Sequence, residues 1–78
     1  ELMLIGLRVD EASALVDKFL DDAFLADAAE VRLVHGFGQG RLRSAVRDIL
    51  KNHPHVTSFR DGAPNEGGAG ATVAELRR

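Results

Sequence analysis

The chain has 78 residues, 45% of them apolar, and a formal net charge of −2. This length fits one small domain, residues 1–78, with a modest core and little room for a deep, enclosed substrate pocket. The sequence contains no cysteine, which excludes a disulfide framework and a thiolate zinc site and favours a cytoplasmic location. Since the sequence opens on Glu1, we interpret it as a piece of a longer protein.

Charge is distributed unevenly along the chain. Residues 1–30 contain eight acidic and two basic residues, a net charge of −6, whereas residues 31–78 contain eight basic and four acidic residues, a net charge of +4. A polyanion would therefore be attracted by the second part of the chain and repelled by the first. The alternative is that both sets of charges are ordinary solvated faces.

Hydrophobic periodicity predicts the secondary structure. Residues 1–5 predict a strand before Gly6, and residues 8–25 predict a helix that begins at Arg8 and has an apolar stripe of Ala12, Leu15, Val16, Phe19 and Ala23. The other expected elements are a strand (30–34), a helix (41–53) ended by Pro54, a strand (55–59), an irregular turn (60–70) and a strand (71–76).

The order β-α-β-α-β-β favours an α/β fold of two layers with a four-stranded mixed sheet. Two strand–helix–strand units require right-handed crossovers and some parallel pairing, and the last two strands can pair antiparallel. Because two helices cannot cover both faces of such a sheet, we expect both on one face. The other face is then open, and strand alternation places Met3 and Ile5 there.

The segment HGFGQG, residues 35–40, lies between the second strand and the second helix. A glycine-rich turn that leads into a helix exposes backbone N–H groups at the positive end of the helix dipole, an arrangement that binds phosphate. Its glycine spacing does not match a dinucleotide-binding or Walker loop. The alternative is a corner that is rich in glycine only because it packs tightly. After the loop, Arg41 is followed by a basic line of residues spaced by four: Arg43, Arg47 and Lys51.

The loop and its flanks resemble the Smr (small MutS-related) domain family. The H-G-x-G-x-G signature of that family stands here as His35, Gly36, Gly38 and Gly40, and PNEGGAGAT resembles its turn before the last strand. The opening, ELMLIGLRVDEA, is most similar to Smr domains at the C-terminal end of MutS-II proteins. The resemblance implies a fold like the C-terminal domain of translation initiation factor three. It also implies binding of branched or duplex DNA, or of RNA or ribosomes, and sequence-nonspecific nicking that serves recombination control.

The first strand departs from the family pattern. Many Smr domains carry L-D-x-H or L-D-x-R there, whereas this chain has Met3 at the acidic position and Ile5 at the basic one. Phosphodiester cleavage needs a base, a positioned water or metal, and neutralisation of the departing charge. Met3 and Ile5 supply none of these.

Two residues near the loop are candidates for catalysis, His35 and Glu66. His35 can act as an acid, a base or a phosphate donor, or it can hold the loop by a hydrogen bond. Glu66 can be catalytic or can accept backbone N–H groups of its turn. The candidate nucleic-acid contacts are Gly36, Gly38, Gly40, Arg41, Arg43, Arg47, Lys51, Arg60 and Asn65.

No metal site is expected, because His53 and His55 lack a third ligand nearby in the sequence. Magnesium or manganese would be a cofactor only for cleavage.

Three functions therefore stay open: a nicking endonuclease, a non-catalytic DNA- or RNA-binding module, and a protein-interaction domain. The third would use the face of Met3 and Ile5 to contact a second copy or other domains of the parent protein.

Overall fold

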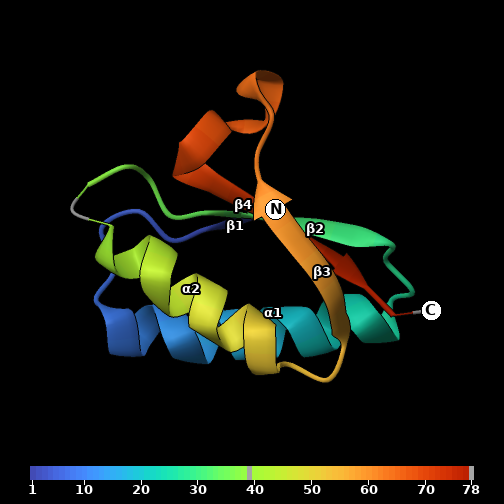
Figure 1. Cartoon of the computed structure of the whole chain (residues 1–78). Coiled ribbons are helices and arrows are strands. Elements are labelled where there is room, and N and C mark those ends of the chain that lie inside the picture. Colours follow the sequence, from blue (N-terminus) through green and yellow to red (C-terminus); the bar gives the residue numbers. More distant parts are fainter. Residues whose placement is uncertain (39, 78) are drawn as a thin grey trace.

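The computed structural model describes residues 1–38 and 40–77, and its helices and strands follow the predicted order (Figure 1). They are β1 (Leu2–Met3), α1 (Val9–Leu25), β2 (Glu30–Val34), α2 (Arg41–Asn52), β3 (Val56–Asp61) and β4 (Ala71–Leu76). Two short 3₁₀ turns, η1 (Pro64–Glu66) and η2 (Gly68–Gly70), precede β4. None of the helices in this described part is long and apolar enough to cross a membrane.

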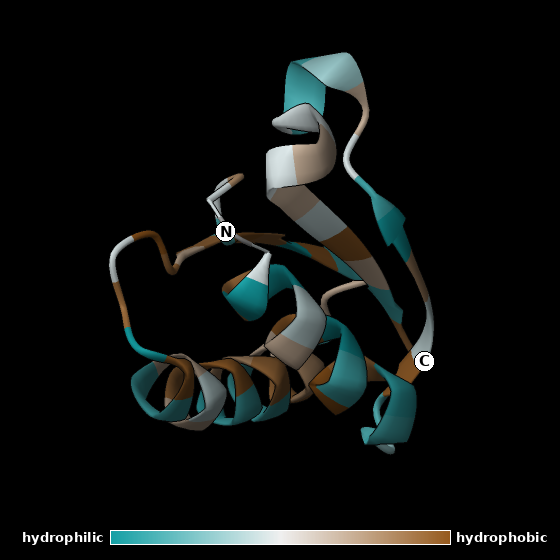
Figure 2. Ribbon diagram, turned by 60° about the vertical axis from the view of Figure 1, so that its left-hand side comes forward, coloured by the Kyte–Doolittle hydropathy of each residue, from teal (hydrophilic) through white to brown (hydrophobic). Residues whose placement is uncertain are grey.

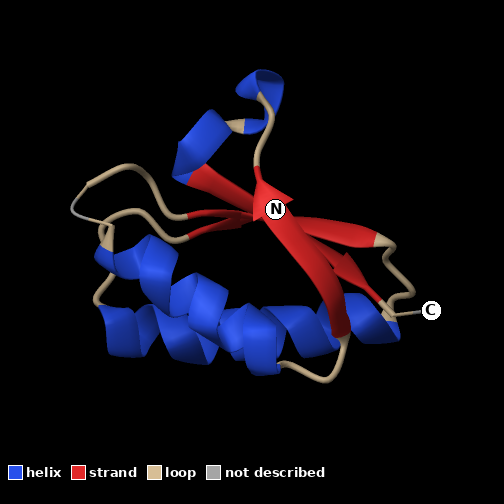
Figure 3. Cartoon of the chain, viewed as in Figure 1, coloured by secondary structure: helices blue, strands red, loops and turns tan. Residues whose placement is uncertain are grey.

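The strands form one mixed sheet in the order β1-β2-β4-β3 (Figure 3). β1 pairs with β2 in parallel, and β4 pairs antiparallel with both β2 and β3. The last strand is therefore inserted between β2 and β3, and each helix connects two strands that run in the same direction. This topology confirms the predicted fold class.

Both helices cover the same face of the sheet, as expected (Figures 1 and 3). In Figure 2, hydrophobic residues run along the central strands and alternate with hydrophilic residues on both helices. The buried apolar residues form one cluster that includes residues of both helices and of the sheet: Leu4, Ala12, Val16, Leu20, Val31, Leu33, Val46, Leu50, Val56, Ala74 and Leu76. Each fully buried valine or leucine contributes about 1.5–3 kcal/mol relative to an exposed one.

The buried stripe of α1 differs from the predicted one at two positions. Leu20 is fully buried, although the predicted stripe omitted it, and Leu15 is 43% exposed, although the stripe included it. Successive helical residues are rotated by about 100°, so the buried face centres on the row Ala12, Val16 and Leu20. Leu15 lies beyond the edge of that row. Arg8 is the N-cap residue, as predicted, and its backbone N–H donates to Oε1 of Glu11 (3.0 Å).

Strand boundaries also differ from the sequence prediction. β1 ends at Met3, earlier than expected, because the chain turns at Gly6, where φ is 87°. Met3 and Ile5 are nevertheless exposed, as predicted, at 57% and 59%. β3 continues to Asp61, and the turn of residues 60–70 expected to be irregular contains η1 and η2. Asp61 stays in the sheet because it pairs with β4 opposite Thr72.

Candidate nucleic-acid interface

The glycine loop, residues 35–40, connects the end of β2 to the start of α2. Its backbone has positive φ at Gly36 (80°) and Gly40 (81°), a region that residues with a Cβ rarely occupy. Packing adds a second requirement at Gly36, because a Cβ there would lie 3.2 Å from Cγ1 of Ile5. Glycine is therefore needed for the loop's conformation as well as for access to its backbone.

His35 is built into the loop rather than displayed on it. The residue is only 4% exposed. Its Nδ1 lies 2.9 Å from the carbonyl oxygen of Gly36, and its Nε2 lies 2.9 Å from Oγ1 of Thr72 on β4. Since a carbonyl only accepts, Nδ1 donates to Gly36, while the Thr72 hydroxyl can either donate to Nε2 or accept from it. Both ring nitrogens thus hold β2, the loop and β4 together.

The N-terminus of α2 is open toward solvent. Its N-cap is Gly40, no side chain of a described residue caps the helix, and its first turn contains no acidic residue. An uncapped helix start presents N–H donors and a partial positive charge. Beside it lies a hollow of about 220 Å³ lined by His35, Gly36, Phe37, Gly38, Gly40, Arg41 and Leu42. This geometry suits an anionic oxygen.

The basic line on α2 is partly neutralised by the protein itself. Arg43 and Arg47 both donate to Oδ1 of Asp61 at the end of β3, the first at 2.8 Å. These hydrogen bonds, from Arg43 first and Arg47 second, lower the pKa of the Asp61 carboxyl. Arg47 also lies over the ring of Phe59, with its guanidinium carbon 5.2 Å from the ring centroid.

The remaining cations of α2 are available. Arg41 and Lys51 are exposed, and no ion pair with another described residue is formed by either. Their Cα atoms are ten residues apart, roughly 15 Å along the helix axis. They would therefore contact different phosphates of a bound strand.

Glu66 and Arg60 form a separate, self-contained pair. Nη1 of Arg60 donates to Oε1 of Glu66 at 2.9 Å, and the backbone N–H of Ala63 donates to the same oxygen at 2.8 Å. The hydrogen bond from Arg60, followed by that from Ala63, lowers the pKa of Glu66 to about 2. Glu66 therefore accepts backbone and guanidinium donors in its turn, and Asn65 beside it is exposed.

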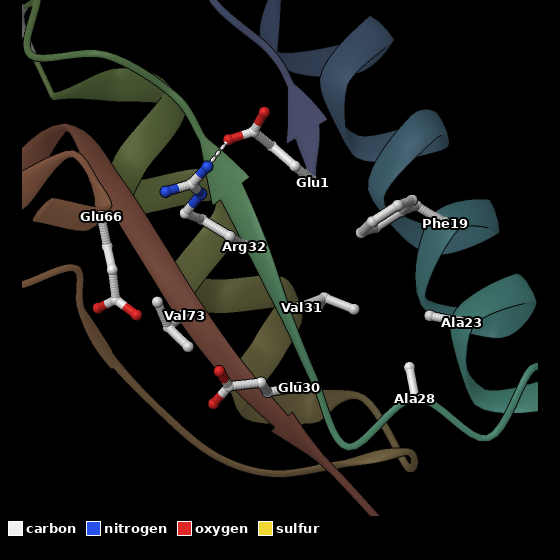
Figure 4. Close-up of a pocket in the computed structure, with 9 residues that line it drawn as sticks. All are labelled: Glu1, Phe19, Ala23, Ala28, Glu30, Val31, Arg32, Glu66 and Val73. Atoms are coloured by element: carbon white, nitrogen blue, oxygen red, sulfur yellow. Dashed lines mark hydrogen bonds and ion pairs between the residues drawn. The ribbon is translucent and has the colours of Figure 1, made fainter.

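A second concave region is chemically unsuited to phosphate. Figure 4 shows a pocket of about 470 Å³ between α1 and the sheet, with Phe19, Ala23, Ala28 and Val31 on one side. Its charged groups are Glu1, Glu30, Glu66 and Arg32, and the guanidinium of Arg32 is already paired with Glu1. Glu1 is paired with Arg32 and Glu66 with Arg60, so the lining offers a polyanion no unpaired cation and the additional negative charge of Glu30.

The two histidines after α2 contact α1. Nε2 of His53 lies 3.4 Å from Oδ1 of Asp17, and the ring of His55 stacks on Phe24 with centroids 3.7 Å apart. Within residues 1–38 and 40–77, no group of three or more His, Cys, Asp or Glu side chains is placed to hold a metal ion. These described residues therefore provide no carboxylate cluster of the kind that holds magnesium or manganese.

Sequence reasoning missed three residues that shape the site. Thr72 and Asp61 are far from their partners in sequence, and no local pattern connects them. Phe37 carried a usable signal, because it stands between two glycines of the loop, and it is 71% exposed.

Fold and site together define a class: a two-layer α/β domain with a glycine loop that leads into a helix start without a side-chain cap from the described residues. The chain belongs to the Smr domain family, whose model matches residues 2–77. It is 58% identical over 77 residues to endonuclease MutS2 of Halalkalibacterium halodurans and 54% identical over 74 residues to endonuclease MutS2 of Clostridium beijerinckii. These matches cover 99% and 95% of this chain, but only 10% and 9% of the two relatives.

Two solved structures share the fold. The crystal structure of the Smr domain of Thermus thermophilus MutS2 superposes with a TM-score of 0.95 at 44% identity, over 99% of this chain and 96% of that one. YdaL, a stand-alone small MutS-related protein from Escherichia coli, superposes with a TM-score of 0.86 at 28% identity, over 97% of this chain and 64% of that one.

Proposed function

We propose that this Smr domain binds the phosphate backbone of nucleic acid at the glycine loop and the start of α2. One observation carries the proposal: among residues 1–38 and 40–77, no side-chain acceptor caps α2 at Gly40, Arg41 beside it is exposed, and the first turn contains no acidic residue. Backbone donors and a cation that converge on solvent bind an anionic oxygen without reading the base sequence. The contacts would be made by the loop glycines and Arg41, and farther along α2 by Lys51.

DNA, branched or duplex, is the partner we propose, with RNA or the ribosome as the alternative. The support for DNA is that the most similar relatives carry the name endonuclease MutS2. The chain spans about a tenth of those proteins. A role in recombination control is therefore proposed for the longer protein as a whole and not for this domain alone.

Nicking is the second candidate function, and the name of those relatives is its motivation. Of the two predicted catalytic residues, His35 has both ring nitrogens in hydrogen bonds. Glu66, with a pKa of about 2, would be a weak base at neutral pH. Met3 and Ile5 add no acid or base. The catalytic roles of His35 and Glu66 stay predictions, and binding is the function that the geometry supports better.

The test of binding compares two arginine variants of the 78-residue chain. Arg41→Ala is expected to weaken duplex DNA binding and to reduce the salt slope of log K by about 0.9, the value of one phosphate contact. Arg8→Ala is the matched control: Arg8 is the N-cap residue of α1 and lies near Asp10 and Glu11, so its loss should leave the salt slope unchanged. Equal effects of the two variants would contradict the proposed surface.

The test of nicking incubates the same chain with supercoiled plasmid, with and without magnesium or manganese. Conversion to the open circular form, lost in His35→Ala but not in Arg8→Ala, would establish cleavage. Intact plasmid at a protein concentration that saturates binding would leave a non-catalytic binding module.

A further inference from the structure

Phe37 lies on the surface of the proposed phosphate site and is 71% exposed. The other phenylalanines are engaged: Phe19 and Phe59 pack against the core, and Phe24 stacks on His55. The chain has no tryptophan or tyrosine. An exposed aromatic ring between two loop glycines is therefore a feature that neither core packing nor loop geometry requires.

The ring packs on one side against the backbone of a glycine. It lies against Gly70 at the end of η2, where a Cβ would come within 2.9 Å of Cε2 of Phe37. The carbonyl of Gly70 in turn accepts hydrogen bonds from the N–H groups of His35 (3.1 Å) and Gly36 (2.8 Å). The loop and the segment before β4 are thus joined beneath the ring, and the rest of the ring is exposed to a ligand.

The ring also shares its surroundings with the phosphate donors. Phe37 lines the same hollow as Gly38, Gly40 and Arg41. On the loop's other side Ile5, 59% exposed, packs beside Gly36. A base is joined to its phosphate through a single sugar, so a phosphate held at the start of α2 brings its base to this apolar surface.

We propose that Phe37 is a stacking platform for an unpaired base, and that the domain prefers single-stranded nucleic acid or unpaired positions to intact duplex. This inference rests on the proposed function. An aromatic face next to phosphate donors is the combination that single-strand binding uses. In an intact duplex both faces of each base are covered by its neighbours, so the ring has nothing to stack on.

The experiment measures binding of a short oligodeoxythymidine and of a blunt duplex of equal nucleotide number. Phe37→Ala is expected to weaken single-strand binding by about 5- to 100-fold and duplex binding by less than about twofold. Phe37→Leu keeps an apolar side chain without a π face and should lose nearly as much. Leu25→Ala, at another exposed apolar residue (81%), should change neither.

Phe37→Trp adds a direct readout, since tryptophan is otherwise absent. Its emission should be quenched by the oligodeoxythymidine while affinity is kept or increased. The inference is overturned if Phe37→Leu binds the single strand as well as wild type, as expected for an apolar protein-docking residue, or if the tryptophan emission does not respond. The stacking inference is also wrong if Phe37→Ala leaves single-strand affinity unchanged while Arg41→Ala weakens binding. In that case the proposed phosphate-binding function still holds. If the wild-type chain binds neither nucleic acid, both fall.

Discussion

Asp61 engages two arginines that the sequence predicted as nucleic-acid contacts. Its Oδ1 accepts from both Arg43 and Arg47, and these contacts lower the pKa of the carboxyl. The carboxylate therefore stays ionised and keeps two of the predicted DNA-contacting cations occupied. Competition with this internal anion weakens any phosphate contact that the two arginines make.

Replacing that anion should strengthen nucleic-acid binding. Asp61→Asn leaves Arg43 and Arg47 with a neutral partner, so we expect duplex affinity at low salt to rise and the salt slope to steepen by about 0.9 for each arginine newly engaged. Asp48→Asn is the matched control, because Asp48 is an exposed residue of α2 and its replacement removes the same charge without releasing an arginine. A salt titration of both variants decides the matter. An equal gain in the two would show that net charge alone is responsible.

Single residues show what the sequence could and could not predict about the site. The glycine loop follows from local composition, and the structure gives it the expected place before α2. The engagement of Arg43 by Asp61, however, joins residues 18 positions apart, and that of His35 by Thr72 joins residues 37 apart. Such contacts depend on the strand register, which periodicity alone does not specify.

At the scale of elements, the bounds of α1, β2, α2 and β4 were predicted to within a residue, whereas the ends of β1 and β3 were not. α1 and β4 were found within a residue of expectation, because their apolar patterns extend over several turns or alternations. β1 retains two residues, too few for a pattern to determine where pairing stops. In the turn between β3 and β4, Glu66 closes η1: its N–H donates to the carbonyl of Ala63, and its side chain accepts the N–H of Ala63.

That turn should be sensitive to pH through Glu66. Its folded pKa of about 2 lies below the ordinary value of about 4.3, so the ionised carboxylate stabilises the fold above that ordinary value and the benefit disappears as the pH falls toward 2. Glu66→Gln should thus lower the urea midpoint by a constant amount above about pH 5, and by progressively less in more acidic solution.

The control for Glu66→Gln is Glu75→Gln, which removes an exposed carboxylate of β4 without breaking the pair with Arg60. Its midpoint at neutral pH should change less. If the loss of urea midpoint in Glu66→Gln became larger on acidification, the ionised carboxylate of Glu66 would not be the form that stabilises the fold.

Across the whole molecule, the helical layer is divided by charge. α1 carries Asp10, Glu11, Asp17, Asp21 and Asp22, whereas α2 beside it carries Arg41, Arg43, Arg47 and Lys51. The open face of the sheet holds self-paired charges, with Glu1 bound to Arg32 and Glu66 to Arg60. This layout follows the charge asymmetry of the sequence, and it agrees with the proposal that a polyanion binds at α2 and the glycine loop.

A pair of lysine variants tests whether the interface extends along α2. Lys51→Ala removes an exposed cation from the last turn of α2, so we expect weaker duplex binding and a salt slope reduced by about 0.9. Lys18→Ala removes the same group from α1, where Lys18 already pairs with Asp22 at 2.9 Å, and should leave the slope as it is. Salt titrations by fluorescence anisotropy provide the measurement. If Lys18→Ala lowers the slope as much as Lys51→Ala does, the charge of α1 does not repel the ligand, and the interface spans both helices.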